Sequence, residues 1–329
     1  MTAATVMTLQ DIYAPVKDDL QRVDDLLDKE LSAHSGKIKD LVDHVSSFSG
    51  KRMRPALALL AGQCFDRVHT AHIYASTVVE LIHSATLVHD DILDEAQIRR
   101  GVPTISAIWG TEISVLLGDY IFSRAFAVIA EFDGSQCLPL ITKTTDKMCE
   151  GELIQLKSRY DLDLTEEMYL KIAELKTASL CAVSTQLGAL LAGADKETVN
   201  NFYTFGLNLG LAFQITDDCL DITGEEDIVG KSLGTDLGQG KLTLPAIRLL
   251  QRLEGAERDE IKTVMQNGLS DENRPRFHEL IRRHGTVESS LDTARTLIDE
   301  GWERLESVPD SEAKQGLRAL GDYILSRDL

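Results

Sequence analysis

Two copies of one acidic motif are the part of this sequence best suited to chemistry. Each copy has the form Asp-Asp-x-x-Asp, and together they supply Asp90, Asp91 and Asp94 in VHDDILDE and Asp217, Asp218 and Asp221 in ITDDCLDI. On a helix, side chains four positions apart share one face, so the first and last aspartates of each motif point the same way. Such carboxylates suit Mg²⁺, which takes one or two of them and completes its shell with water and phosphate oxygens. The motifs therefore predict magnesium sites that hold a phosphorylated ligand, with the metal ligands Asp90, Asp94, Asp217 and Asp221.

The repetition of the motif argues against a merely solvated surface turn. Either copy alone could be an acidic helix end in contact with water, but both copies follow long apolar runs and neither belongs to a low-complexity acidic segment. Carboxylates at the C-terminal end of a helix also face the negative end of its dipole and repel one another. We therefore expect positive groups nearby.

Several basic residues could supply this positive charge. Lys51, Arg52 and Arg54 form a cluster in SGKRMRPALAL, and Arg99 and Arg100 follow the first motif. Beyond the second motif come Lys231 in VGKS and Lys241 in QGKLTLP. Each would be an ordinary surface charge if it stood alone, but guanidinium groups bind phosphate bidentately and lysines add point charge.

Four polar residues in apolar surroundings are further candidates. Lys176 and Thr177 lie in AELKTASL, and Gln214 precedes Asp218 by one helical turn. His83, in ELIHSATL, is by residue type alone better read as a satisfied core histidine than as a ligand.

The whole chain is expected to form one all-α domain, residues 1–329, with residues 1–8 flexible. Apolar residues recur at spacings of three and four from end to end, and the 329 residues include only seven prolines. The runs at 71–95 and 197–222 are apolar on most of their circumference, which predicts helices at the centre of a bundle around a deep cavity. The expected helices are 9–33, 37–47, 54–64, 71–95, 111–131, 137–159, 165–193, 197–222, 242–253, 257–267, 273–284, 287–306 and 310–327.

Composition and charge limit the cellular compartment and the partners that we expect for this protein. A formal net charge of -19 argues against binding nucleic acid. The five cysteines lie within apolar stretches without Cys-x-x-Cys spacing, which is typical of reduced thiols. No signal peptide or membrane span is evident, so we expect a cytoplasmic protein.

Taken in order, several segments resemble the signatures of the trans-type polyprenyl diphosphate synthases. They are GKRMRP, HSATLVHDDILDEAQIRRG, ELKTA and AFQITDDCLDITGEEDIVGKSLGTDLGQGKLTLP, and the resemblance covers roughly residues 45–250. It implies an Mg²⁺-dependent enzyme that joins isopentenyl diphosphate to an allylic diphosphate, and it implies a homodimer.

The resemblance also assigns roles by matching positions. It implies isopentenyl diphosphate binding by Lys51, Arg54, His83 and Arg100. It implies allylic diphosphate binding by Arg99, Lys176, Thr177, Gln214, Lys231 and Lys241. The residues expected to carry the reaction are Asp90, Asp91, Asp94, Lys176, Thr177, Asp217 and Asp218.

Product length is expected to depend on Ala85 and Thr86, which lie about one turn before Asp90. A large aromatic side chain there would close the floor of the cavity, whereas alanine and threonine leave it open. The tunnel is expected to continue towards Val78, Leu81, Leu116, Phe122 and Phe126. This favours a product of thirty carbons or more, with a geranylgeranyl-type product of twenty carbons or a shorter one as the alternative. Close helix packing is the less favoured explanation of the small residues.

Three other functions fit part of the sequence. His89-Asp90 resembles the His-Asp pair of helical metal phosphohydrolases, but that function leaves the second motif unexplained. A terpene cyclase could use the first motif, but the second motif and the Lys51/Arg54 site favour condensation. A non-catalytic synthase subunit would have lost some of the aspartates or basic residues, and this chain retains them.

Overall fold

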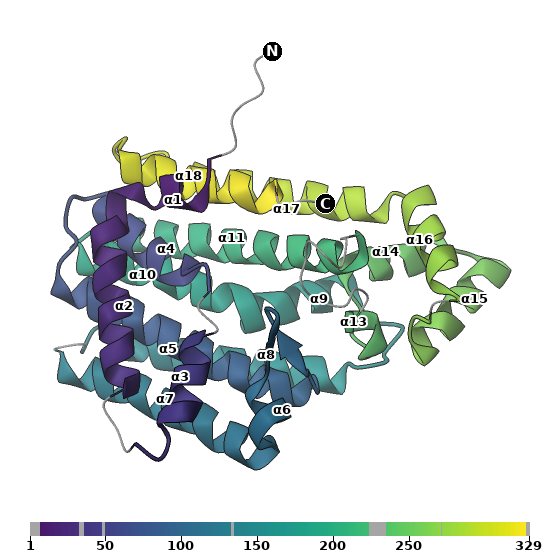
Figure 1. The fold of residues 1–329 in the computed structure, drawn as a ribbon. Coiled ribbons are helices and arrows are strands. Elements are labelled where there is room, and N and C mark those ends of the chain that lie inside the picture. The colour runs from purple at the N-terminus through teal and green to yellow at the C-terminus, as the bar shows by residue number, and fades with distance from the viewer. Residues whose placement is uncertain are drawn as a thin grey trace.

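The computed structural model describes residues 7–32, 36–47, 50–132, 135–223, 235–270 and 272–326. This part of the chain is a bundle of helices with one two-stranded hairpin, so the all-α prediction is confirmed (Figure 1). In the N-terminal half the elements are α1 (Leu9–Ile12), η1 (Ala14–Val16), α2 (Lys17–Ser32), α3 (Lys39–Ser47), α4 (Met53–Gln63), α5 (Thr70–Leu93), β1 (Ile98–Arg99), β2 (Val102–Pro103), α6 (Ile105–Trp109), α7 (Thr111–Glu131) and α8 (Leu138–Lys157). They are followed by α9 (Glu166–Ala173), η2 (Glu174–Ala178), α10 (Ser179–Leu191), α11 (Lys196–Thr223), α13 (Thr235–Gly238), α14 (Leu244–Arg252), α15 (Gly255–Asn267), α16 (Arg274–Arg283), α17 (Thr286–Glu303) and α18 (Glu312–Leu325).

The core lies where α4, α5, α10 and α11 pack against one another. As the sequence predicted, α5 and α11 are inner helices: α7 packs along α5, and α17 packs along α11 (Figure 1). Close contact between α4 and α10 depends on Gly188, because a Cβ there would lie only 2.1 Å from the Ala58 carbonyl oxygen. This packing fixes the helix ends that carry the two aspartate motifs.

Three local features depart from the predicted helices. Pro15 interrupts the expected helix 9–33, since proline suits the first turn of a helix but not its interior. A β-hairpin follows the first motif, and its two turn residues, Arg100 and Gly101, both have positive φ, as a type I′ turn requires. The expected helix 165–193 contains the π-helical turn η2.

The N-terminal expectation falls largely outside the described residues. Residues 1–6 are not described, and Thr8 caps α1 by accepting a hydrogen bond from the Asp11 backbone N–H. Any flexibility of this segment therefore stays a prediction.

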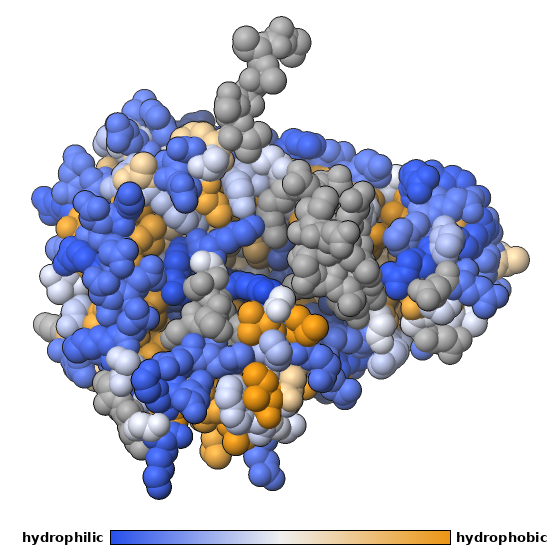
Figure 2. All heavy atoms as spheres, in the orientation of Figure 1, coloured by the Kyte–Doolittle hydropathy of each residue, from blue (hydrophilic) through white to orange (hydrophobic). Residues whose placement is uncertain are grey.

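Helix α7 corrects one detail of the predicted tunnel. Its buried stripe, which includes Leu117, Gly118, Ile121 and Ala125, repeats at helical spacing, whereas Leu116 is 68% exposed and Phe126 is 38% exposed. Leu116 and Phe126 therefore face outward, and their expected place in the tunnel is wrong. By length and composition α7 could cross a membrane, but here it packs along α5. Hydrophilic residues cover most of the face shown in Figure 2, with apolar residues gathered in smaller patches.

Candidate active site

The first aspartate motif stands at the C-terminal end of α5, where its three carboxylates have different partners. Asp91 is buried and accepts a 2.7 Å hydrogen bond from Arg99 of the hairpin. Asp94 caps the helix and forms a 2.7 Å ion pair with Lys241. Burial, the largest effect, raises the pKa of Asp90 to about 6. Asp90 therefore combines a desolvated carboxylate with nearby cations.

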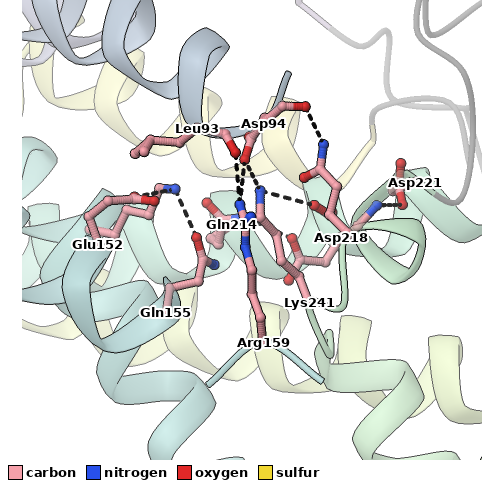
Figure 3. A network of polar contacts seen from close by, with 12 residues as sticks. Leu93, Asp94, Glu152, Gln155, Arg159, Gln214, Asp218, Asp221 and Lys241 are labelled. Atoms are coloured by element: carbon pink, nitrogen blue, oxygen red, sulfur yellow. Dashed lines mark hydrogen bonds and ion pairs between the residues drawn. The ribbon is translucent and has the colours of Figure 1, made fainter. Parts of the chain in front are cut away.

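The second motif lies near the C-terminal end of α11 and faces the first (Figure 3). Asp218 is buried and accepts hydrogen bonds from Tyr169 Oη at 2.6 Å and from Gln214 Nε2 at 2.7 Å. Burial and then the Asp236 carboxylate raise the pKa of Asp218 well above its ordinary value, although these two hydrogen bonds oppose the shift. Asp218 is thus held by protein donors, whereas Asp217 and Asp221 are only half-buried.

Lys176 and Thr177 reach the same region because η2 changes the helical register. A π-turn adds one residue to a helical turn and so redirects the side chains that it carries. Gly151 of α8 permits this turn to pack closely, since a Cβ there would lie 2.7 Å from the Lys176 backbone nitrogen. Lys176 donates to Gln155 Oε1 at 2.9 Å and pairs with Glu152, while Thr177 donates to Gln214 Oε1 at 2.8 Å. Although burial opposes its charge, the Asp90 and Glu152 carboxylates raise the pKa of Lys176.

Cationic side chains also surround His83. Arg54 Nη1 lies 3.0 Å from His83 Nε2, and Arg100 packs over Gly50, where a Cβ would approach Arg100 Nη1 to 2.9 Å. Burial, and next the charges of Arg54 and Arg100, lower the pKa of His83 well below its ordinary value. Gly50, His83 and Arg100 line a hollow of about 540 Å³ that includes open solvent. Arg52 also lines the hollow and pairs with Glu80 at 2.8 Å, so an anion that entered would meet the guanidinium groups of Arg52 and Arg100.

Lys51 stands beside this group but turns towards α18. Its ammonium donates to Tyr323 Oη at 2.9 Å, and its carbonyl accepts from Tyr13 Oη at 3.0 Å. Of the remaining predicted residues, Lys231 lies outside the described residues.

The two residues expected to set product length differ in their surroundings. Ala85 is completely buried, whereas Thr86 is half-buried and donates its hydroxyl to the His83 carbonyl oxygen at 2.8 Å. Below them, Val78 and Leu81 are fully buried on the same helix. Thr86 is thus the more accessible of the two positions.

Several residues of this site were not predicted from the sequence. They are Glu152, Gln155, Arg159, Tyr169 and Asp236. Asp236 could have been noticed, since it lies between Lys231 and Lys241 in the segment that carries the resemblance. The others lie on α8, on α9 or, for Arg159, just beyond the end of α8, in ordinary patterns that give no local signal.

The donor chemistry of the site fits magnesium bound together with a ligand. Within the described ranges, no group of three or more His, Cys, Asp or Glu side chains could hold a metal by itself. Mg²⁺ uses few carboxylates and completes its shell with phosphate oxygens and water, so a diphosphate would supply what the protein lacks. Asp90, Asp94, Asp217 and Asp221 offer carboxylate oxygens of the required hard type from both sides of the site.

Comparison with known proteins identifies the family. The family profile described as polyprenyl synthetase matches residues 35–280. The chain belongs to this family. It is 36% identical to heptaprenyl diphosphate synthase component 2 of Geobacillus stearothermophilus, over 98% of this chain and 100% of the relative. It is 31% identical to the octaprenyl diphosphate synthase of Escherichia coli, over 98% of this chain and 100% of that enzyme.

Solved structures agree with this membership. A decaprenyl diphosphate synthase from Rhodobacter capsulatus superimposes with a TM-score of 0.91 at 33% identity, covering 97% of this chain and 99% of that one. A polyprenyl synthase from Caulobacter crescentus, whose structure contains calcium and isoprenyl diphosphate, gives a TM-score of 0.93 at 32% identity, covering 99% of both chains. This polyprenyl synthetase family member is therefore a prenyltransferase with an isoprenoid synthase fold.

The geometry of His89 argues against the phosphohydrolase alternative. Its Nε2 lies 3.1 Å from the Val115 carbonyl oxygen, and a Cβ at Gly118 would approach that nitrogen to 2.1 Å. His89 therefore packs against α7 rather than joining Asp90 in a metal site.

Proposed function

We propose that this polyprenyl synthetase family member is an Mg²⁺-dependent trans-polyprenyl diphosphate synthase that extends an allylic diphosphate with isopentenyl diphosphate. The observation that carries this proposal is the 2.7 Å ion pair between Asp94 and Lys241. It links the first aspartate motif to the lysine-bearing segment that follows the second motif. Two separate stretches of sequence thereby contribute to one site of opposite charges.

Each of the two substrates is assigned its own set of cationic residues. Arg54, His83 and Arg100 would hold the diphosphate of isopentenyl diphosphate, with Lys51 at its edge. Arg99, Lys176 and Lys241 would stand on the allylic side, where Gln214 orients Thr177 through their hydrogen bond. Lys231 belongs to the same proposal through the family resemblance alone.

The reaction needs charge stabilisation and no protein nucleophile. Magnesium held by Asp90, Asp94, Asp217 and Asp221 would stabilise negative charge on the departing diphosphate. Lys176 and Lys241 add positive charge from the protein, and the Thr177 hydroxyl oxygen would face the allylic cation. The allylic carbon–oxygen bond breaks, and the isopentenyl double bond attacks the resulting allylic cation to form the new carbon–carbon bond. The condensed cation then loses a proton to the released diphosphate, which gives the product.

The product is proposed to have thirty carbons or more. The small side chains of Ala85 and Thr86 support this length because neither can block a chain that descends along α5. The named relatives include hepta-, octa- and nonaprenyl synthases, which fits a long product, although a short-chain isoprenyl diphosphate synthase from Methanothermobacter thermautotrophicus is also 33% identical.

The enzyme is further proposed to act in the cytoplasm as a homodimer joined through α7. The support is the outer face of α7, where Val115, Leu116 and Phe126 are large, apolar and exposed.

The dependence on metal tests the proposed reaction. Protein freed of metal by chelation should not incorporate labelled isopentenyl diphosphate into an allylic primer, and Mg²⁺ should restore incorporation. Equal incorporation without any divalent cation would contradict the proposal.

A further inference from the structure

Arg159, just beyond the end of α8, points its guanidinium group at the end of α5 (Figure 3). Arg159 Nη2 donates to the Leu93 carbonyl oxygen at 3.2 Å and to Asp94 Oδ1 at 3.1 Å. The side chain is 23% exposed, so these contacts are only partly screened by water. No part of the family resemblance singled out this residue.

Two cations converge on the Asp94 carboxylate. Lys241 Nζ lies 2.7 Å from the same Oδ1 atom that Arg159 contacts, and Asp236 is a second, more distant acidic neighbour of Lys241 at 4.0 Å. Lys241 is only 8% exposed and Arg159 is largely enclosed, which strengthens their mutual repulsion. A diphosphate oxygen beside Asp94 would meet both of these cations at once.

Arg159 also has an unused donor. Its Nε is buried, and within the described part of the chain no hydrogen-bond acceptor reaches it. A buried donor without a partner is costly, and most such groups in folded proteins are satisfied. Because this Nε has almost no accessible surface, a phosphate oxygen would reach it only after the side chain shifts, and the guanidinium group is suited to such an acceptor.

The backbone around Arg159 holds it in place. Tyr160 adopts φ +64, and its backbone N–H donates to the Gly240 carbonyl oxygen at 2.7 Å. Gly240 permits this contact, because a Cβ there would lie 2.7 Å from the Tyr160 ring. Gln239 Nε2 adds a 2.9 Å hydrogen bond to the Asp94 carbonyl oxygen. Arg159 and Lys241 are therefore presented to Asp94 from two segments joined to each other.

We propose that Arg159 is a further diphosphate-binding residue of the allylic site, acting with Lys241 beside Asp94. The inference rests on the proposed function, since its ligand is the diphosphate group of the allylic substrate. The guanidinium group binds diphosphate oxygens and adds positive charge beside the diphosphate as it departs.

The experiment measures binding of inorganic pyrophosphate to the full-length protein by calorimetry in the presence of Mg²⁺. Arg159→Gln should weaken pyrophosphate binding roughly 10- to 100-fold, as expected for the loss of hydrogen bonds to a charged group. The pyrophosphate affinity of Arg159→Lys should lie between those of Arg159→Gln and the wild type. Lysine keeps the positive charge but lacks the two parallel N–H donors of a guanidinium group. Arg318→Gln, which removes a 3.1 Å contact with Asp299 on α17, is the matched control and should bind as the wild type does.

Thermal unfolding checks that each variant is folded. Steady-state kinetics then separates a role in ligand binding from a structural role. KM for the allylic primer should rise in Arg159→Gln while KM for isopentenyl diphosphate stays within about twofold. Wild-type pyrophosphate affinity in folded Arg159→Gln would overturn this inference and leave the proposed function intact. An equal rise in both KM values would also overturn it. Wild-type protein that neither binds pyrophosphate nor elongates a primer would overturn both proposals.

Discussion

Tyr169 donates a 2.6 Å hydrogen bond to the buried carboxylate of Asp218. Asp218 is the middle residue of the second motif, and Gln214 Nε2 occupies its other oxygen at 2.7 Å. Asp217 and Asp221 are half-buried, in contrast to Asp218. We therefore expect Asp218 to hold the end of α11 in place and Asp217 and Asp221 to be the metal ligands.

Replacing Tyr169 by phenylalanine tests this division. The buried Asp218 oxygen would lose its donor, so we expect the free energy of unfolding to fall by about 1–3 kcal/mol. We also expect a higher Mg²⁺ concentration for half-maximal activity, because Asp217 and Asp221 would be less well positioned. Tyr203→Phe is the control, since it loses a 2.9 Å hydrogen bond from Lys147 in a different part of the bundle. The same change in Mg²⁺ dependence in both variants would show that Tyr169 has no specific role.

The raised pKa of Asp90 predicts how the stability of the metal-free protein depends on pH. Burial raises this pKa from 3.8 to about 6, so the native state retains a proton that the unfolded state releases near pH 4. Between these values the native state binds more protons, and the free energy of unfolding falls as pH increases. Asp90→Asn should lack the decrease in the free energy of unfolding that Asp90 causes. This decrease is about 3 kcal/mol at most between pH 4 and pH 7.

Urea unfolding of both proteins from pH 5 to pH 7.5 measures this effect. The free energy of unfolding of the wild type should fall relative to that of Asp90→Asn as pH rises. The difference between the two should become constant above the raised pKa. Parallel curves across the whole range would mean that Asp90 ionises in the fold as it does in water.

Product length should respond to the position of Thr86 on α5. Thr86→Phe places an aromatic ring one turn before Asp90 and should shorten the longest product, measured by chromatography of the dephosphorylated alcohols. Leu116→Phe is the control, because Leu116 is 68% exposed on the outer face of α7. Unchanged product length in Thr86→Phe, or shortening in the control, would contradict the proposed path of the chain.

The exposed apolar face of α7 should hold two copies of the chain together. Leu116→Glu places a charge in the middle of Val115, Leu116 and Phe126 and should convert a dimer into a monomer in sedimentation experiments. Leu153→Glu on α8, where Leu153 is 63% exposed, should leave the mass unchanged. A wild type that sediments as a monomer would overturn the proposed dimer.

The sequence predicted the helices and the two motifs because both depend on local patterns. Helical spacing placed α5 and α11 at the centre, and their motifs do meet at one site. The partners of the aspartates were less predictable, since they depend on how distant segments pack. Arg159 follows α8 and Tyr169 lies on α9, and the spacing of residues in the sequence does not specify how either segment is oriented. The π-turn at Lys176, which packs closely against Gly151, was missed for the same reason.

The assignment of Leu116 and Phe126 to the tunnel failed for a related reason. An apolar helix can bury either of its faces, and the sequence alone did not show that Leu117, Gly118 and Ile121 form the inner one. The small residue Gly118, which accommodates His89, marks the buried side in the structure.

The central claim is that both aspartate motifs serve one site that elongates allylic diphosphates. Its most direct test is incubation of the purified protein with Mg²⁺, labelled isopentenyl diphosphate and, in separate reactions, a five-, ten-, fifteen- or twenty-carbon allylic primer, followed by chain-length analysis. We predict elongation of at least one primer to products of thirty carbons or more, and loss of that elongation in both Asp90→Asn and Asp217→Asn. No elongation of any primer by the wild type, or full activity after loss of either motif's first aspartate, would contradict the account.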